Sequence, residues 1–586
     1  MTRHPKLSLS LAALLAGCAV FVVWISSKRT RSNDAIAAKP QGPVTFNKHI
    51  APILFSHCSS CHRPNQAAPF PLLTFHDAQK RAKQIADVTQ RRIMPPWLPE
   101  PGVGDFLGAR NLQSEQIELI QRWVAQGAVE GEPSDLPSPP TWTEGWSLGE
   151  PDLIVQMPEA HTLPAEGQDV YRNFAIPIPI ANSRFVRGIE FRPGNLKVVH
   201  HAFIRFDPTP ESRRLDALDA APGFGGIHLP VSAQSPDGHF LSWQPGKVAA
   251  KPVEGLAWKL EQGSDLVLQM HLQPAGKPES VQSSVGFYFT DKPPTSTPFK
   301  IRLTSFDIDI PAGADSYTVK DSYVLPVDAE VLAVLPHAHY LGKKIQSYAT
   351  LPNGAKQWLL LIREWNFNWQ GDYRYAKPVA LPRGTTLTIE FVYDNSLGNP
   401  RNPNQPPRRV QYGLQSSDEM AELWLQVTLR DAKDRETLAR DYQHKVARET
   451  VAYNTYLLRS NPKDGRAQTE LAKAMMSERR FDEAFRYLRA AVENAPDFDE
   501  AHYFLGSLLR TQKKLAEAKV AFGNALRANP QNFKAHGNLG LIHLEQGQLN
   551  EAESHFRSAL AINPNDTISR ESLEEILKAR GAKRTR

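Results

Sequence analysis

Two histidines separated by a single residue are the first sign of chemistry in this chain. His337 and His339 follow an apolar stretch from Val331 to Val334. Because side chains alternate along a β-strand, both imidazoles are predicted to point to the same face. A lone pair of this kind is more often an ordinary pair of surface or core histidines than a metal site. The metal interpretation therefore depends on further ligands elsewhere in the chain.

Three more histidines lie earlier, in apolar segments of the kind that form strands. His200 and His201 are adjacent, and His271 ends the stretch that begins at Leu266. Neighbouring side chains face opposite ways on a regular strand. His200 and His201 can therefore share one ion only at a bend, at a bulge or beyond a strand end. With that condition, the three imidazoles predict one metal site, for copper or, as an alternative, for zinc.

A methionine completes a second set of ligands. Met420 follows the acidic turn Ser416–Glu419. Together with His337 and His339 it would provide two imidazoles and one thioether. Zinc, calcium and magnesium rarely take a thioether ligand, whereas copper that cycles through Cu(I) does. The sequence therefore predicts two metal sites of different donor type, with copper in the second.

Taken in order, four segments resemble the copper type II, ascorbate-dependent monooxygenases, the family of peptidylglycine α-hydroxylating monooxygenase and dopamine β-monooxygenase. The segments are Val199–Phe203, Leu266–His271, His337–Lys343 and Ser416–Met420. The resemblance covers about residues 150–430 and implies two all-β, jelly-roll-like sandwich domains, over 150–292 and 296–432. Short alternating apolar runs separated by Pro, Gly and Asn independently favour an all-β sandwich in this region.

The resemblance also implies a role for each predicted metal site. The electron-transfer copper would be held by His200, His201 and His271, and the catalytic copper by His337, His339 and Met420. In the family the two domains face each other across a water-filled cleft. Dioxygen binds at the catalytic copper, a C–H bond of the substrate is hydroxylated, and a small reductant such as ascorbate supplies electrons.

Three positions depart from the peptide-hydroxylating members of the family. Leu335 stands where they place an arginine for a substrate carboxylate, and Glu422 and Trp424 replace an asparagine and a tyrosine. The substrate is therefore left open, and Glu422 is either a partner for an amine or a solvated residue at a strand end. Two loop histidines, His228 and His239, either orient the metal ligands or are ordinary loop residues.

A second redox motif lies near the N-terminus. Cys58, Cys61 and His62 form the pattern Cys-x-x-Cys-His, which is typical of covalently attached haem c. Two thiols bind the haem vinyl groups, and the histidine binds iron. A zinc site would need more ligands, and a redox dithiol would need a thioredoxin-like βαβ pattern, which is absent. Met94, in a proline-rich loop, is predicted as the second iron ligand, since a methionine there suits electron transfer.

The residues around this motif, 44–132, resemble a small all-α cytochrome c domain. Ser114 is predicted to cap a helix that carries Ile117 and Ile120 on one face. The weaker alternatives for the second iron ligand are His57 and His76. The chain has only one other cysteine, Cys18, so no disulfide framework is expected.

The N-terminal segment has the composition of an export signal. Residues 7–25 are almost wholly apolar with basic residues on both sides, and about 19 such residues can just span a bilayer. We predict residues 1–43 to be a signal-anchor and linker that place the protein in the bacterial periplasm or cell envelope. Lipoprotein attachment at Cys18 and a cleaved signal peptide are the alternatives. The net charge of +6 is spread without long basic runs, so no nucleic-acid binding is predicted.

Four prolines recur every 34 residues in the C-terminal part of the chain. They are Pro462, Pro496, Pro530 and Pro564. Small and aromatic residues repeat with the same period, which is that of tetratricopeptide repeats. This pattern predicts an α-solenoid over 440–583, with three repeats at about 465–566 and a capping helix. Its concave face predicts a protein partner.

Together these parts predict a multidomain enzyme with a fused electron carrier. A chain of 586 residues is long enough for about four domains. The prediction is an exported monooxygenase with two copper ions and one haem c, acting with dioxygen on a small-molecule substrate. The haem would relay electrons to the first copper, because covalent linkage gives a high effective concentration of the donor. The alternatives are an electron-transfer or ligand-binding protein with non-catalytic copper domains, and a scaffold dominated by the repeats.

Overall fold

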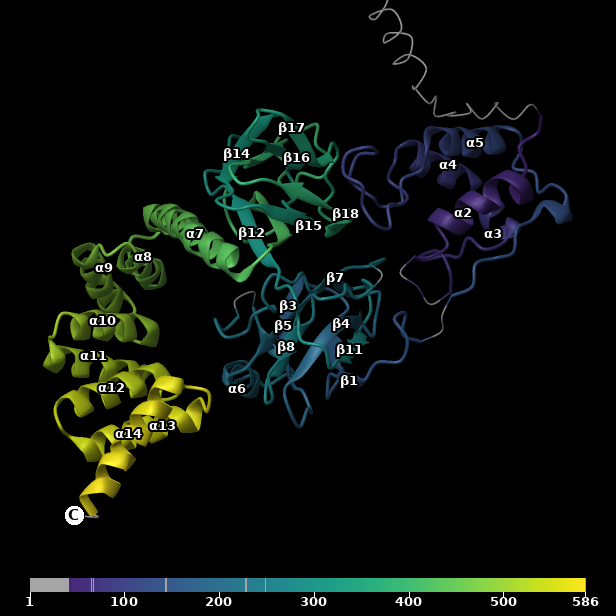
Figure 1. Ribbon diagram of the computed structural model, residues 1–586. Helices are drawn as coiled ribbons and strands as arrows, with labels where there is room; N and C mark the ends of the chain where they lie inside the picture. The colour runs from purple at the N-terminus through teal and green to yellow at the C-terminus, as the bar shows by residue number, and fades with distance from the viewer. Residues whose placement is uncertain are drawn as a thin grey trace, which may run out of the picture. The chain divides into compact units, whose positions relative to one another are not determined.

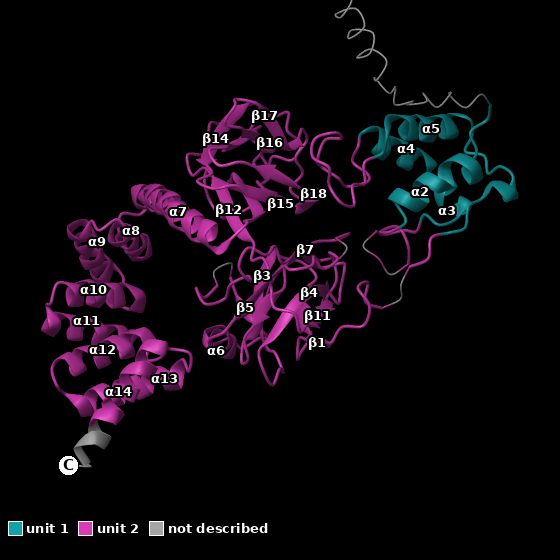
Figure 2. Ribbon diagram, in the orientation of Figure 1, with its two compact units in different colours: residues 1–59, 72–91, 112–139 teal, residues 60–71, 92–111, 140–586 magenta. Residues whose placement is uncertain are grey.

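The structure is a computed structural model that describes residues 42–584 apart from 65, 67, 143–144, 227–228 and 248 (Figure 1). The chain forms two compact units, which Figure 2 colours separately. The first unit takes in the described residues up to Ser59 together with 72–91 and 112–139, and the second takes in 60–71, 92–111 and the chain from Pro140. Two stretches of the predicted cytochrome domain thus belong to the second unit.

Short helices make up the regular structure of the first unit. They are η1 (Phe46–Ile50), α2 (Ala51–His57), α3 (Phe75–Lys80), α4 (Ala82–Gln90), α5 (Ser114–Ala125) and η2 (Pro133–Asp135). Helix α5 begins with a capping box between Gln113 and Gln116, so Ser114 is the first helical residue and not the cap. Its inner face buries Ile120 and Trp123 completely. The unit is helical, and its assignment as a cytochrome stays a prediction.

The second unit contains an all-β lobe over residues 151–290, which we call the first lobe. Its elements are β1 (Leu153–Gln156), β2 (His161–Leu163), β3 (Val170–Pro177), β4 (Arg184–Arg192), β5 (Val199–Asp207), α6 (Glu211–Leu218), β6 (Phe224–Gly225), β7 (Ser242–Trp243), β8 (Trp258–Leu260), β9 (Asp265–Leu272), β10 (Glu279–Val281) and β11 (Ser284–Thr290). The larger sheets have the orders β1-β11-β4-β8 and β6-β3-β9-β5-β7. Val186 of one sheet and Leu268 of the other lie in the same buried core, so the lobe is a sandwich.

A second all-β lobe follows over residues 299–428. Its strands are β12 (Phe299–Thr304), β13 (Asp309–Ile310), β14 (Tyr317–Val324), β15 (Ala329–His337), β16 (Gly342–Thr350), β17 (Lys356–Ile362), β18 (Tyr373–Leu381), β19 (Thr386–Tyr393), β20 (Val410–Gln411) and β21 (Glu422–Thr428). The larger sheets have the orders β12-β21-β15-β18 and β14-β19-β16-β17. Leu425 of one sheet and Ile389 of the other share one core. The predicted all-β region is therefore confirmed.

The two kinds of strand follow from the two kinds of apolar pattern. Strand β9 is buried at every position, in line with its continuous apolar run, and it lies inside its sheet between β3 and β5. Strand β19 alternates between buried and half-buried residues, as expected when one face is turned to the core. The sheet orders place β5 beside β9 and β15 beside β21, which brings the predicted ligand segments together in pairs.

Helix α7 (Ala432–Ser460) is attached to the second lobe by buried charges. Glu449 pairs with Arg302 of β12 at 2.9 Å, and Lys445 pairs with Asp321 of β14 at 2.6 Å. Removing one partner of such a pair would leave an uncompensated buried charge. The helix is therefore fastened to the β region, although the sequence pattern assigned most of it to the helical array.

Seven helices then form three hairpins and a final helix. They are α8 (Gly465–Ser477), α9 (Phe481–Asn494), α10 (Asp499–Thr511), α11 (Leu515–Ala528), α12 (Phe533–Glu545), α13 (Leu549–Ile562) and α14 (Thr567–Arg584). The repeated glycines allow close helix contact, because a Cβ on Gly540 would lie 2.6 Å from the ring of Phe556. The predicted helical array in this part of the chain is confirmed, whereas its exact bounds and the capping role of its last helix stay predictions.

Among the residues that the structure describes, no helix has the length and apolar character needed to cross a membrane. The predicted N-terminal anchor, and the localisation in the periplasm or cell envelope that rested on it, are therefore withdrawn. Residues 7–25 and Cys18, which carried the anchor and its lipoprotein alternative, lie outside the described residues.

Candidate metal centres

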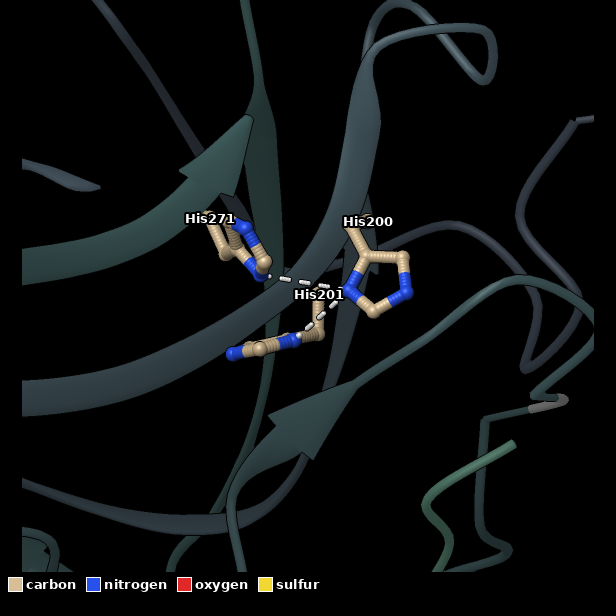
Figure 3. A group of neighbouring side chains, drawn as sticks. All are labelled: His200, His201 and His271. Atoms are coloured by element: carbon tan, nitrogen blue, oxygen red, sulfur yellow. Dashed lines mark hydrogen bonds between the residues drawn. The ribbon is translucent and has the colours of Figure 1, made fainter. Parts of the chain in front are cut away.

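The three-imidazole site lies on two neighbouring strands of the first lobe. Strand β5 carries His200 and His201, β9 carries His271, and His201 lies directly opposite His271 in the antiparallel pair. The register shifts between Val199 and His201, and such an irregularity is one of the three arrangements that the sequence left open for a shared ion. Both neighbouring rings are thereby turned toward the ring of His271 (Figure 3).

The Nδ1 atoms of these three rings converge. Nδ1 of His200 lies 3.1 Å from Nδ1 of His201 and 3.2 Å from Nδ1 of His271. Three nitrogens bound at about 2 Å to one ion lie roughly 3 Å apart, so the spacing fits a shared metal ion. An imidazole nitrogen offers either one proton or one lone pair, so Nδ1 of His200 can make only one of its two contacts as a hydrogen bond. A cation at the centre would satisfy all three lone pairs.

Burial keeps the three rings in the neutral form that binds metals. Loss of hydration lowers the pKa of His200 to about 4. Burial also lowers the pKa of His271, although the carboxylate of Asp169 acts in the opposite direction. The pKa of His201 is lowered first by burial and then by the neighbouring imidazoles. No proton therefore has to leave these rings before an ion binds at neutral pH.

An aspartate that the sequence argument missed orients the third ring. Oδ2 of Asp169 accepts hydrogen bonds from Nε2 of His271 at 2.7 Å and from Nε2 of Gln273 at 3.0 Å. With its proton on Nε2, His271 turns the lone pair of Nδ1 toward the site. Tyr171 stacks on the same ring with 4.3 Å between centroids and 10° between planes. In the sequence, the only local sign of this role is that an acidic residue directly precedes strand β3.

The second candidate site lies where β15 ends and β21 begins, at one end of these two inner strands. His337 pairs with Glu422, and continuing that register by two residues places His339 opposite Met420. Nδ1 of His339 lies 3.1 Å from the carbonyl oxygen of Asp418, so the segment that carries Met420 runs beside His339. The rings of His337 and His339 have centroids 5.1 Å apart. The fold thus brings the three residues to one end of the sheet, and their role as copper ligands stays a prediction.

A fully buried carboxylate holds this end of the sheet together. Glu419 accepts hydrogen bonds from the backbone N–H groups of His339 at 2.9 Å, Leu341 at 2.6 Å and Met420 at 3.2 Å. Burial raises the pKa of Glu419 to about 8, while these N–H donors act in the opposite direction. From the sequence, Glu419 was predicted only to belong to an acidic turn. Its position next to Met420 was the available signal.

The loop between β17 and β18, residues 363–372, supports the second site from another side. Nε1 of Trp365 donates to the carbonyl oxygen of His339 at 3.1 Å, and Nδ1 of His337 donates to Oε1 of Gln370. His337 therefore keeps Nε2 for an ion. Burial lowers the pKa of His339 to about 3, so this ring too is neutral. We call this segment the bridging loop, because it also reaches the first site.

One aromatic ring of the bridging loop lies within contact range of both candidate sites. The centroid of Phe367 is 5.7 Å from that of His339 and 6.3 Å from that of His200. Phe367 is buried and also contacts Tyr340, with 4.5 Å between centroids. Nε2 of Gln426 in the second lobe donates to the carbonyl oxygen of Gly238 in the first at 2.8 Å. Phe367 is therefore a buried neighbour of one ring from each candidate site.

The residues that the sequence suggested as neighbours of the substrate or the metal ligands have surroundings that differ in part from the prediction. Glu422 is only 8 % exposed, so the solvated alternative is wrong. Its carboxylate accepts hydrogen bonds from the Arg302 guanidinium and from Nε1 of Trp424, both at 3.3 Å. His239 contacts the ring of Trp258 at 4.9 Å between centroids, which favours its interpretation as an ordinary loop residue. His228 lies outside the described residues.

The predicted haem residues fall in both units. Cys58 directly follows α2 in the first unit, whereas Cys61, His62 and Met94 belong to the second. Both thiols are partly exposed and neither forms a disulfide. Nδ1 of His62 donates to the carbonyl oxygen of Phe70 at 3.0 Å, which leaves Nε2 as the nitrogen suited to iron. Covalent haem attachment at these residues, with Met94 as the second iron ligand, stays a prediction.

Comparison with known proteins identifies the C-terminal helices. The tetratricopeptide repeat family model matches residues 452–497, 469–519 and 505–567. Similar solved structures include a crystal structure of MamA, with 20% identity over 26% of this chain and 86% of that chain and a TM-score of 0.22. They also include the first TPR of Spaghetti (RPAP3) bound to an HSP90 peptide, with 20% identity over 20% of this chain and 94% of that chain and a TM-score of 0.20. At these TM-scores the likeness carries no argument beyond the family match. No curated protein matches the chain.

Proposed function

We propose that the protein is a copper-dependent monooxygenase that hydroxylates a C–H bond of a small organic substrate with dioxygen. The observation that carries the proposal is the convergence of three Nδ1 atoms at the β5 bulge. Beside it, the second histidine pair shares the buried ring of Phe367 as a neighbour. Bound copper would supply one-electron redox chemistry and the activation of dioxygen.

The two donor sets favour copper over zinc. The first site offers nitrogen only, which either metal accepts, but the second would add the thioether of Met420 to two imidazoles. Two redox-active ions suit a reaction that uses electrons one at a time. A zinc hydrolase would have no use for a second, sulfur-containing site beside the first.

The surrounding side chains would hold each ligand set in place without themselves binding metal. Asp169 orients His271 through Nε2, and Glu419 holds the backbone of the turn that carries His339. Phe367 would exclude water from the space between the sites. Each of these groups fixes a position before any substrate arrives, so the ligands need little reorganisation.

The residues near the second site favour an uncharged substrate. Leu335 is apolar, and it stands where peptide-hydroxylating enzymes are expected to hold a carboxylate. Glu422 is engaged by Arg302 and Trp424, so its charge is not offered to an amine. The rings of Tyr340 and Phe367 provide apolar surface beside His339. We therefore favour a neutral, partly apolar molecule over a peptide acid or an amine.

Electrons would reach the first copper from a haem attached at Cys58 and Cys61. His62 would ligate its iron, and covalent linkage would keep the donor at high effective concentration. A small reductant, ascorbate or an equivalent, would supply the haem or the copper. Stopped-flow reduction of the copper in wild type and His62→Ala tests the relay, which is excluded if both proteins are reduced at the same rate.

The tetratricopeptide array would dock a protein partner on its concave face. Repeats of this kind stack into extended surfaces that bind polypeptide segments. In this chain the array follows α7, which is fastened to the second lobe by buried ion pairs. A bound partner would thus be held to the rest of the enzyme through a stiff connection.

Metal analysis followed by oxygen uptake tests the enzyme proposal. Wild type should bind copper at both sites of the β lobes, and His271→Ala and His337→Ala should each bind one copper ion fewer than wild type. Both variants should lose oxygen consumption with ascorbate and a panel of neutral substrates. The matched control is His444→Ala, which removes an exposed histidine of α7 and should change neither quantity.

Two other outcomes of this experiment would contradict the enzyme proposal. A protein that binds two copper ions but consumes no oxygen with any reductant would favour the electron-transfer alternative. A protein that binds no copper would exclude both.

A further inference from the structure

Three histidines gather in the last repeat hairpin, far from the candidate metal centres of the β lobes in the sequence. Helix α12 carries His536 and His543, and α13 carries His555. Nδ1 of His536 lies 3.1 Å from Nδ1 of His555. The ring of His543 stacks on His555 with 5.5 Å between centroids and 16° between planes. All three side chains are half-buried, so ions in solution can reach them.

Hydrogen bonds on the outer side orient two of these rings. His536 bonds to the backbone of Pro530, and because proline has no N–H the histidine must donate to the carbonyl. Nδ1 of His543 donates to Oε1 of Gln548 at 2.6 Å. A neutral imidazole that donates one N–H presents its other nitrogen as a lone pair. Outer hydrogen bonds of this kind are the usual accompaniment of metal-binding histidines.

The repeat period separates the structural histidine from the additional ones. His502 occupies the position of His536 one repeat earlier and binds the Pro496 carbonyl oxygen at 2.8 Å. Gln468 does the same for Pro462 at 2.9 Å in the first repeat. A side chain that binds the proline carbonyl is therefore part of the repeat fold itself.

The other two histidines have no such role in the earlier repeat. The positions of His543 and His555 are occupied there by Leu509 and Ala521. The repeat packs with a leucine and an alanine at these positions, so the fold does not require imidazoles there. Their joint presence beside His536 in one hairpin calls for another explanation.

We propose that His536, His543 and His555 bind one divalent transition-metal ion that joins α12 to α13. The 3.1 Å separation of the two Nδ1 atoms suits two ligands at about 2 Å from a shared ion. In this structure the ring of His543 stacks on His555, and it would become the third ligand by rotating toward the pair and giving up its hydrogen bond to Gln548. An all-imidazole donor set takes zinc, copper or nickel and not calcium or magnesium. This site does not depend on the proposed monooxygenase activity.

Zinc binding by the full-length, untagged chain tests the proposal. The variant His536→Gln/His543→Leu/His555→Ala replaces each histidine with the residue found in an earlier repeat, so the hairpin should keep its fold. Metal-free protein is dialysed against Zn²⁺, and bound zinc is measured by elemental analysis. The triple variant should bind one zinc ion fewer than wild type. Zinc should also raise the thermal unfolding temperature of the helical array, followed by circular dichroism at 222 nm, in wild type but not in the triple variant.

His502→Gln is the matched control, because it changes the equivalent histidine of the preceding repeat to the residue used in the first. It should bind as much zinc as wild type. The proposal is overturned if the triple variant binds the same amount of zinc as wild type, or if His502→Gln loses as much. Loss of zinc in the triple variant together with unchanged copper spectra of the two β-lobe sites would separate this site from those of the β lobes.

Discussion

The two candidate metal centres present similar ligands with different kinds of support. In the first lobe the three histidines sit on two central strands, and a bulge and the side chain of Asp169 aim the rings. In the second lobe the ligands lie at strand ends, where Glu419 holds the backbone itself. The comparison teaches that ligands within paired strands need only their side chains oriented, whereas ligands at or beyond strand ends need the backbone fixed first. Each support can be removed without changing a ligand.

Loss of the backbone clamp should have the largest effect. Glu419→Ala leaves three buried N–H donors without their acceptor, and we expect about 4 kcal/mol of lost stability in urea unfolding. Copper at the second site should be lost, while copper at the first is kept. Glu419→Gln, which retains one acceptor oxygen, should lose less. Equal loss of copper from both sites would show that the two lobes do not differ as described.

Replacing Phe367, whose ring neighbours both sites, should have the second-largest effect. Phe367→Ala empties a buried position and should cost about 3 kcal/mol of stability. Because Phe367 contacts both His200 and His339, copper spectra of both sites should change. Phe367→Leu fills most of the volume and serves as the control for packing. A change confined to one site would contradict the shared position of this ring.

Loss of the Asp169 carboxylate in the first lobe should have a milder effect. Asp169→Asn keeps the size of the side chain but removes the charge that fixes the His271 tautomer. We expect copper affinity at the first site to fall about 10-fold to 100-fold, with the second site unchanged. Competition with a chelator measures both affinities. The prediction fails if the second site weakens as much as the first.

The smallest effect is expected at the amide that contacts His337. Gln370→Ala removes one hydrogen bond to Nδ1 while Glu419 still holds the neighbouring backbone. We expect the affinity of the second site for copper to fall roughly 10-fold and the stability to change by about 1 kcal/mol. A loss as large as that of Glu419→Ala would mean that side-chain orientation, not the backbone clamp, governs this site.

The candidate ligands were readable in the sequence because their chemistry is local. A His-x-His pair, an adjacent histidine pair and a methionine after an acidic turn are all visible without knowing the fold. For the adjacent pair the sequence predicted a bend, a bulge or a strand end, and β5 contains a register shift there. The repeat array was readable for a similar reason, since its contacts recur with a fixed period. The final helices follow that period closely.

The supporting residues were not readable, because they lie far along the chain from what they support. Asp169 is 102 residues from His271, and Glu419 is 80 residues from His339. No local pattern distinguishes these acids from the many others in the chain. Nothing in the sequence singled out Phe367, and Glu422 was left as either an amine partner or a solvated residue, whereas the structure pairs Glu422 with Arg302.

The sequence by itself determined the all-β and repeat character of the two large regions, and it predicts the types of metal donor and the haem attachment. Each depends on residue types at short spacing, so it survives without tertiary information. Only the tertiary structure decided which strands are neighbours, and hence which rings converge and which carboxylates hold them. Strand pairing joins segments that are distant in the chain, and its register arises from the packing of the whole sandwich core rather than from any one segment.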